Sequence, residues 1–373
     1  MRTRDDDKIP VQATGIFVIA AMSELNVLVA PSEVASAAGR DAWLSVLLGF
    51  VGLTLGCWLV VAVVRRHPGE SLVEIVRSVL GRGPGTAVVL FYIVFWTTRT
   101  AVLTRVQAGL FGLTLLPATP ETVVILLFLF LSTYLARHGV EPMSRFFLLT
   151  VPAYLAPLFV LIVASAPGMD LGRLQPVLGR GGGPVLEGAL VAFAEGPGVE
   201  TLLMVGPHLL RFDGAMKSAM IAMAYLSTTA VLLLVVLIAR FGGFDVSEHV
   251  FPTLSLVETI DVPGFSGLRL DPVFNVLWFL AIFCSAALSH YAAASALYRL
   301  VPFRNSYRPV YVIALAAVAL TMVPTGFQQL LEWNLRWRIY TVPAASLGIP
   351  LILYAASRLA RPGRGSGKEG RRP

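Results

Sequence analysis

Residues 190–201 read LVAFAEGPGVET and place a carboxylate and a Gly-Pro-Gly turn inside a long apolar segment. Proline lacks a backbone N–H and disfavours the α conformation at the residue before it, so Pro197 predicts that a helix here is interrupted. Backbone groups left unpaired at membrane depth are tolerated only where they face protein or a wet cavity. The stretch therefore predicts a broken membrane helix that lines a binding site. A helix that is merely kinked is the alternative, because Gly and Pro are common in membrane helices.

The composition around this stretch is that of an integral membrane protein. Of 373 residues, 56% are hydrophobic and 14% are charged, whereas soluble domains carry about 25% charged residues. Apolar runs of about 20 residues, enough to cross a hydrocarbon core as a helix, recur along the chain. We predict an all-α integral membrane protein whose ten transmembrane helices lie at about residues 12–37, 42–64, 86–116, 121–137, 143–166, 185–210, 215–240, 270–298, 309–325 and 339–359.

A single transmembrane domain is expected. It covers residues 12–359, between a cytoplasmic N-terminal segment (1–11) and a disordered, basic cytoplasmic tail (360–373). With both termini cytoplasmic, most of the 29 Lys and Arg residues fall on the inner face and few, such as Arg336 and Arg338, on the outer face, which satisfies the positive-inside rule. The net charge of +7 fits contact with membrane lipid headgroups, and the charges are too dispersed for nucleic acid binding.

Three longer connections have distinct patterns. Residues 65–85 carry apolar side chains at helical spacing between charges, which predicts a short interfacial helix on the inner side. Residues 166–184 are rich in Gly and Pro and predict an irregular outer loop. An amphipathic piece after Pro252, at about 250–265, is expected on the outer surface, where it could act as a lid.

A second break is predicted in the first span, where Glu24 and Asn26 precede Pro31. The first and sixth spans open the two sets of five, so the corresponding segment of each half is interrupted. This arrangement is typical of a five-plus-five inverted repeat with a binding site near the bilayer midplane. Repeat one would cover residues 12–166 and repeat two residues 185–359.

The two breaks predict a site for a small polar ligand. One half of a broken helix presents free N–H groups and the other presents free carbonyls, a pair that suits a zwitterion. Glu24 and Glu195 are carboxylates in otherwise apolar spans next to the breaks, where they would bind an ammonium group or carry a proton. The alternative is that each pairs with a membrane arginine, Arg99 or Arg105, as structural glue. These two arginines do not share a helix face, so at most one is expected to point at the ligand.

Sequence signatures of soluble enzymes are absent, including the zinc-hydrolase, serine-hydrolase and P-loop patterns. We therefore predict no catalytic residues, no metal and no cofactor, although a membrane enzyme with a dispersed site stays as an alternative. Cys57 and Cys284 lie in apolar spans and are expected to be small buried residues.

Several loop segments resemble one family more specifically than the spans do. Residues 250–283, VFPTLSLVETIDVPGFSGLRLDPVFNVLWFLAIF, are similar to the characteristic stretch of spore germination proteins that form the B subunit of GerA-type germinant receptors. The matching pieces are Pro252-Thr253, Val262-Pro263-Gly264, Arg269-Leu270-Asp271 and Trp278, with AGRDAWLS at 38–45, LLPATPETVV at 115–124, HGVEPMSR at 138–145 and LGRLQPVLGRG at 171–181. The resemblance runs from about residue 10 to residue 355.

This resemblance implies the LeuT-like fold of the amino acid-polyamine-organocation (APC) superfamily and a location in the spore inner membrane. It implies a nutrient germinant, typically an amino acid, bound between spans one, three, six and eight, and two partner subunits, an A-type membrane protein and a C-type lipoprotein. The ligand-binding residues that it implies, together with the residues next to the breaks, are Glu24, Asn26, Thr98, Phe193, Glu195, Gly196, Ser285 and Ser289. The first break departs from related transporters, because ELNVLVAP stands where small glycine-type residues are common.

Two functions remain open at this point. The loop motifs favour a germinant receptor subunit. The pair of membrane carboxylates favours an amino acid transporter coupled to protons through Glu24 or Glu195. The fold accommodates both functions, since function resides in the site.

Overall fold

The structure is a computed structural model that describes residues 8–24, 27–260 and 271–359. Asn26, residues 262–264 and 269–270 of the resembling stretch, and the predicted disordered tail therefore lie outside the described residues. The helices are α1 (Ala13–Met22), α2 (Ala30–Ala38), η1 (Gly39–Asp41), α3 (Ala42–Arg66), α4 (Leu72–Leu80), α5 (Arg82–Thr114), α6 (Glu121–His138), α7 (Val140–Ala164), η2 (Leu171–Leu174), α8 (Gly182–Ala194), η3 (Val199–Thr201), α9 (Leu202–Val205), η4 (Gly206–His208), α10 (Ala215–Phe241), α11 (Gly243–Glu248), α12 (Pro252–Glu258), α13 (Asp271–Leu300), α14 (Arg308–Thr321), α15 (Phe327–Val342), η5 (Pro343–Gly348) and α16 (Ile349–Leu359).

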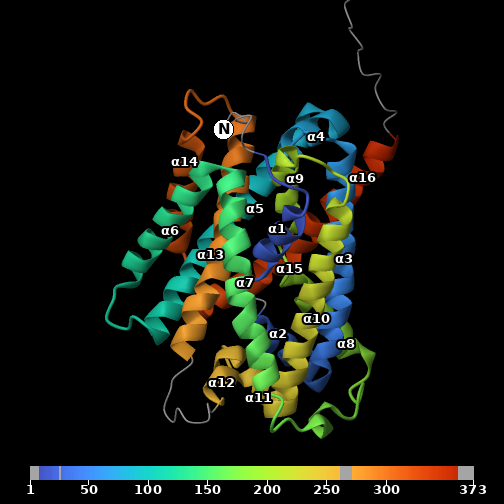
Figure 1. Cartoon of the computed structure of the whole chain (residues 1–373), viewed down its shortest axis with the longest axis vertical. Helices are drawn as coiled ribbons and strands as arrows, with labels where there is room; N and C mark the ends of the chain where they lie inside the picture. The colour runs from blue at the N-terminus through green and yellow to red at the C-terminus, as the bar shows by residue number, and fades with distance from the viewer. Residues whose placement is uncertain (1–7, 25–26, 261–270, 360–373) are drawn as a thin grey trace, which may run out of the picture.

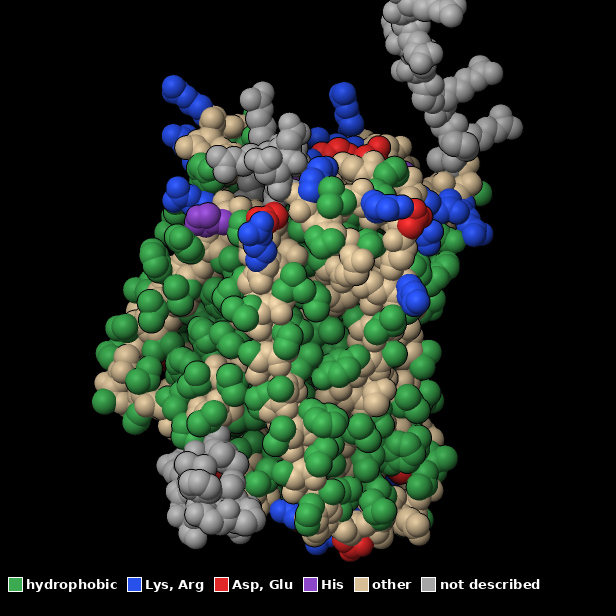
Figure 2. All heavy atoms as spheres, in the orientation of Figure 1, with side chains coloured by type: hydrophobic (Ala, Val, Ile, Leu, Met, Phe, Trp, Pro, Cys, Tyr) green, Lys and Arg blue, Asp and Glu red, His purple; other side chains and the backbone are tan. Residues whose placement is uncertain are grey.

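The long helices form one upright bundle, with the short helices α4, α11 and α12 at its ends (Figure 1). Apolar side chains cover the middle of the visible face, and charged side chains gather at the two ends (Figure 2). Within the described ranges, eight helical stretches are long and apolar enough to cross a membrane, and two further apolar helices, α1 and α14, are shorter. The all-α membrane fold is confirmed. The count of ten complete transmembrane helices stays a prediction, and so do the domain bounds.

Both predicted breaks are present. The first broken helix consists of α1 and α2, and the second consists of α8 and the short run η3, α9 and η4. Pro31 lies in the first turn of α2, where its missing N–H removes no helical hydrogen bond. In the second break, Glu195 ends α8 and Gly198 precedes η3. The proline and glycine residues thus interrupt the helices where the sequence predicts.

Several predicted boundaries need correction. The last span begins at Phe327, not near 339, because α15, η5 and α16 form one helical stretch from Phe327 to Leu359. Arg338 is therefore not an outer-face residue: it lies inside α15 and is 3% exposed. The helix predicted in 65–85 is present as α4, and the piece after Pro252 is helical as α12. The inner interfacial location of α4 and the outer location of α12 stay predictions.

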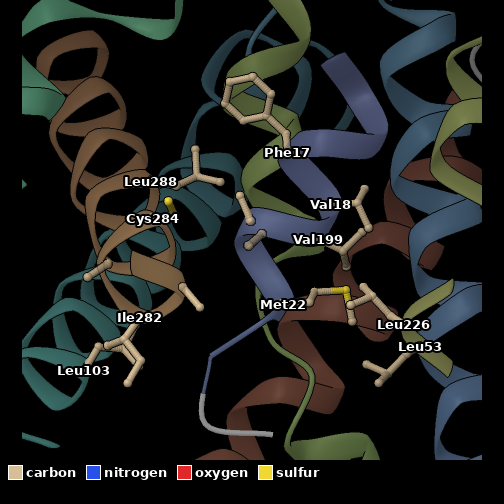
Figure 3. Close-up of a cluster of buried hydrophobic side chains, with 14 of the residues drawn as sticks. Phe17, Val18, Met22, Leu53, Leu103, Val199, Leu226, Ile282, Cys284 and Leu288 are labelled. Carbon is tan, nitrogen blue, oxygen red and sulfur yellow. The ribbon is translucent and has the colours of Figure 1, made fainter. Parts of the chain in front are cut away.

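The core surrounds α1. Phe17, Val18 and Met22 of α1 point toward apolar side chains of the neighbouring helices, among them Leu226 of α10 and Leu288 of α13 (Figure 3). The two free cysteines, Cys57 and Cys284, are buried as predicted. This packing fixes the end of α1 at the centre of the bundle, next to the second break.

Backbone hydrogen bonds tie the beginning of the first broken helix to the end of the second. The N–H of Ile9 donates to the carbonyl of His208 (2.9 Å), and the N–H of Leu210 donates to the carbonyl of Ile9 (3.0 Å). Ile9 and Leu209 form a parallel bridge. The segment before α1 is thereby fixed to the residues that follow η4.

Candidate functional site

The two breaks touch each other at Gly198. This glycine has φ +131°, a conformation that side-chain-bearing residues rarely adopt. A Cβ atom there would lie 2.5 Å from the carbonyl oxygen of Ala21, near the end of α1. Only a residue without a side chain allows the two backbones to approach this closely, and this contact brings the free carbonyls of both broken helices together.

Arg99 of α5 projects into the junction of the two breaks. Its Nη2 contacts the carbonyl oxygen of Ala21 in the first break and lies 3.0 Å from the carbonyl oxygen of Pro197 in the second. On α13, Ser285 Oγ lies 2.7 Å from Nη2, and Ser289 Oγ accepts a hydrogen bond from Nη1 at 3.0 Å. One guanidinium thus joins both breaks to α5 and α13.

Glu24 supplies the counter-charge. Its Oε2 lies 2.7 Å from Arg99 Nη2 and accepts a hydrogen bond from Ser285 Oγ at 2.5 Å. Its Oε1 accepts a bond from Arg99 Nε at 3.3 Å, and its backbone carbonyl accepts one from Trp278 Nε1 at 2.9 Å. Glu24 and Arg99 are both fully buried and form a neutral, hydrogen-bonded pair, which is the pairing that the sequence left as an alternative for this glutamate.

The short helix α12 contacts the first break. Thr253, one of the residues that carry the family resemblance, donates from Oγ1 to the carbonyl oxygen of Val27. Val27 lies between α1 and α2, so this bond satisfies one of the carbonyls that the break leaves free. Movement of α12 as a lid stays a prediction.

Glu195 does not pair with either of the arginines that the sequence suggested. It forms an ion pair with Nη1 of Arg338, whose Nη2 lies 3.0 Å from Oε2 of Glu33 on α2. Glu195 and Arg338 are buried, and the side chain of Glu33 is 12% exposed. Glu195 and Glu24 therefore belong to two separate clusters.

Arg105 and Thr98 lie away from the breaks. Nη1 of Arg105 lies 2.6 Å from Oε2 of Glu121, at the start of α6. Thr98 and Arg105 both line a cavity of about 180 Å³ between α5, α14 and α15. Its other lining residues include Trp333 and Trp337. Thr98, placed in the ligand site by the family resemblance, thus points to a different cavity from Arg99.

Phe193 and Gly196 contact α3. A Cβ atom added to Gly52 of α3 would lie 2.7 Å from the ring of Phe193. A Cβ atom added to Gly196 would lie 2.3 Å from a methyl group of Leu53. The cavity beside Glu195 and Gly196 is about 20 Å³. In this conformation both residues pack against neighbouring helices.

Glu200 is a buried carboxylate that the sequence analysis did not select. It accepts hydrogen bonds from Gly198 N–H (2.9 Å), Ser346 Oγ (3.1 Å) and Trp96 Nε1 (3.3 Å). It lies at the N-terminal end of the second half of the broken helix, where free N–H groups favour negative charge. The signal was visible in the sequence, since a second glutamate follows Glu195 within the same broken segment.

The charges around Arg99 are of the two kinds that a zwitterion carries. A carboxylate and a guanidinium lie side by side at the junction of two helix breaks, with hydroxyl groups and free carbonyls around them. Such a pair complements both charges of an amino acid. Among the described residues, no cluster of three or more His, Cys, Asp or Glu side chains could hold a metal ion.

Comparison with known proteins gives related sequences along nearly the whole chain. Residues 8–329 match the model of a family described as spore germination protein. The chain is 28% identical over 357 residues to spore germination protein KB of Bacillus subtilis (strain 168), covering 93% of this chain and 94% of that protein. It is 24% identical over 288 residues to spore germination protein YndE of the same organism, covering 77% and 79%.

Solved structures of transporters share the fold. MhsT, solved in complex with L-phenylalanine, matches with a TM-score of 0.64 and 15% identity, over 93% of this chain and 95% of that one. Mhp1, a nucleobase-cation-symport-1 family transporter solved in a closed conformation with bromovinylhydantoin bound, matches with a TM-score of 0.64 and 13% identity, over 93% and 77%. The predicted LeuT-like fold with discontinuous first and sixth helices is confirmed.

Proposed function

The chain belongs to the spore germination protein family, and from that membership we propose that it is the transmembrane subunit of a spore nutrient germinant receptor. In this proposal, it binds a small germinant such as an amino acid and triggers germination. The ligand lies near the midplane, between the broken helices α1–α2 and α8–α9 and the helices α5 and α13. The protein resides in the spore inner membrane with both termini cytoplasmic, next to an A-type membrane subunit and a C-type lipoprotein.

The observation that carries the ligand proposal is the Glu24–Arg99 ion pair at the junction of the breaks. A zwitterion can insert between Glu24 and Arg99, so that the one contact between these residues is replaced by two contacts with the ligand. The ligand carboxylate then pairs with Arg99 and its ammonium group pairs with Glu24. Because total charge is unchanged, no uncompensated charge is left at membrane depth.

Ligand entry requires the pair to open, since Arg99 now occupies the space between the breaks. Arg99 contacts both broken helices and α13, so a ligand that takes its carboxylate contact would loosen the bonds from Arg99 to Ala21 and Pro197. Binding energy is thereby linked to the relative position of the broken helices, which is what a receptor needs to signal to partner subunits.

A second candidate function is a proton-coupled amino acid transporter of the APC superfamily. The specific observation in its favour is the fold shared with MhsT and Mhp1 over most of the chain. A flux assay in vesicles separates the two functions, because a transporter accumulates a labelled amino acid that a receptor only binds.

Thermal unfolding of the purified protein against a panel of amino acids tests the ligand proposal. A ligand that binds only the folded state raises its stability, by about 2.7 kcal/mol at a hundredfold excess over Kd. We expect stabilisation by particular amino acids that is lost in Glu24→Gln and weakened in Ser289→Ala. A Glu74→Gln variant, altered at the interfacial helix α4, is the matched control and keeps the response. Full stabilisation of Glu24→Gln would contradict the proposed site.

A further inference from the structure

The cluster of Glu33, Arg338 and Glu195 contains two carboxyl groups and one guanidinium. Each residue comes from a different element: Glu33 from α2, Glu195 from the end of α8 and Arg338 from α15. Their side chains are 12%, 3% and 4% exposed. If both carboxyl groups were ionised, the cluster would hold one uncompensated negative charge in the interior of the bundle, which is costly at membrane depth.

The hydrogen bonding within the cluster is also incomplete. Arg338 Nη2 donates to both oxygens of Glu33, at 3.0 and 3.3 Å, and its Nε lies 3.4 Å from the carbonyl oxygen of Asn334. Glu195 contacts the same guanidinium through Nη1, yet neither of its oxygens has a hydrogen bond of good geometry from the described groups. The two carboxyl groups share this one guanidinium. A proton held between them would supply the missing bond and cancel the excess charge.

The surroundings offer Glu195 no other way to balance this charge. The small cavity that it lines is otherwise formed by apolar residues and Gly196, with α3 contributing Val46, Phe50 and Leu53 and α10 contributing Ala230 and Leu234. The nearby Glu24 already has Arg99 as its partner, and Ser346 of η5 bonds to Glu200. No further cation faces Glu195 within the described parts of the chain.

We propose that Glu33, Arg338 and Glu195 form a proton-binding site that holds α2, α8 and α15 together. α2 belongs to the first broken helix and α8 to the second, and both lie in the half of the bundle opposite α4 (Figure 1). With the proton bound, the cluster is neutral and these helices stay closed. Loss of the proton leaves two carboxylates on one guanidinium, and their repulsion favours separation of α2 from α8. The site does not depend on which germinant the protein binds.

The pH dependence of unfolding of the purified full-length protein tests this site. If the folded state holds one proton that the unfolded chain releases near neutral pH, the unfolding equilibrium constant rises about tenfold per pH unit. We expect Glu33→Gln and Glu195→Gln each to remove this dependence, because either amide leaves one carboxylate for Arg338. The control Glu74→Gln keeps the wild-type dependence near neutral pH, because the lowered pKa of Glu74 confines its own titration to the acid range. A Glu195→Gln variant whose pH dependence equals that of the wild type would overturn the proposal.

Infrared difference spectroscopy provides a second readout that does not require the variants to be stable. We expect wild-type protein at neutral pH to show the C=O stretching band of a protonated carboxylic acid, and this band to shift on transfer to heavy water. Its absence from the wild type would overturn the proposal. Loss of the band in Glu33→Gln or Glu195→Gln, but not in Glu74→Gln, assigns it to this cluster. Amino acid binding is measured separately, so failure of the proton site leaves the ligand proposal untouched.

Discussion

Two buried ionic clusters lie at the broken helices, and they differ in balance. Around Arg99, one carboxylate meets one guanidinium, and two serines, a tryptophan and the free carbonyls of both breaks complete the hydrogen bonds. Around Arg338, two carboxylates share one guanidinium, and the oxygens of Glu195 lack good donors. Both clusters connect the two broken helices, the first through backbone carbonyls and the second through side-chain charges.

In the proposed receptor, the two clusters perform different tasks. A neutral, fully bonded pair has a fixed charge and can exchange partners with a zwitterion. A cluster with an excess of acid responds to proton concentration, because its charge is balanced only when a proton is bound. Single substitutions alter one cluster at a time, and the partly exposed Glu74–Arg299 pair serves as the reference.

The largest effect is expected from Arg99→Met, which leaves Glu24 buried without its partner. Removing one member of a buried ion pair costs about 3–5 kcal/mol of stability. The free energy of unfolding in detergent, or the yield of folded protein, measures this loss. The double variant Glu24→Gln/Arg99→Met, which restores neutrality, should recover much of it. Equal stability of Arg99→Met and the wild type would show that the pair does not hold the junction.

A smaller effect is expected from Gly198→Ala, which disturbs the same cluster without changing a charge. The added Cβ meets the backbone of Ala21 and the positive φ becomes strained, at a cost of about 1–3 kcal/mol. The matched control is Gly196→Ala, whose Cβ comes nearest to side-chain atoms of Leu53 and not to backbone, and it should cost less. Thermal unfolding of the two variants side by side measures the difference, and the reverse order of stability would contradict the close contact of the breaks.

Removal of the Ser289 hydroxyl, a single neutral acceptor, should lower the stability less than either of these changes. Ser289→Ala deletes one hydrogen bond from Arg99 Nη1 while the Glu24 contact remains. The expected loss is about 1 kcal/mol, as for a typical buried hydrogen bond. Unfolding by denaturant measures it. A loss as large as that of Arg99→Met would mean that Ser289 supports more of the cluster than this one bond.

The smallest effect is expected at the partly exposed ion pair in which Glu74 of α4 lies 2.9 Å from Arg299 of α13. Partial burial acts to raise the pKa of Glu74, but hydrogen bonds from Ser71 and the charge of Arg299 outweigh it and lower the pKa. The pair therefore stabilises the docking of α4 at neutral pH, and this contribution is lost as pH falls through the lowered pKa. Glu74→Gln should cost under about 1 kcal/mol, because the carboxylate is 43% exposed. Hydrogen exchange of α4 as a function of pH measures it, and a pH-independent difference between Glu74→Gln and the wild type would contradict the ionic contribution.

Much of the fold could be predicted from the sequence because hydropathy and helix breakers are local signals. Pro31 and Pro197 mark the two breaks, and Glu24 and Arg99 are recognisable as charges in apolar spans. Hydropathy and helix breakers do not tell which neighbouring helix a side chain faces. Thr98 and Arg99 are adjacent, yet successive residues point about 100° apart around a helix, so only Arg99 meets the breaks.

The second cluster was missed for a related reason. Arg338 lies in the polar stretch EWNLRWRIY at 332–340, whose average composition predicts an outer loop. In the structure this stretch is part of α15, and a single face of that helix turns Arg338 into the interior. Glu33 becomes significant only when α2 and α15 are placed side by side. No pattern along the chain brings these two residues together.

The parallel bridge between Ile9 and Leu209 gives the two broken helices an asymmetric mechanical design. Near this bridge they are joined by main-chain hydrogen bonds, which carry no titratable group and do not depend on side-chain identity. At the opposite half, Arg338 joins α2 to α8 through ionisable side chains. A rearrangement that separates α2 from α8 would therefore leave the bridged ends joined, and the two broken helices would part first on the side of Glu33, Arg338 and Glu195.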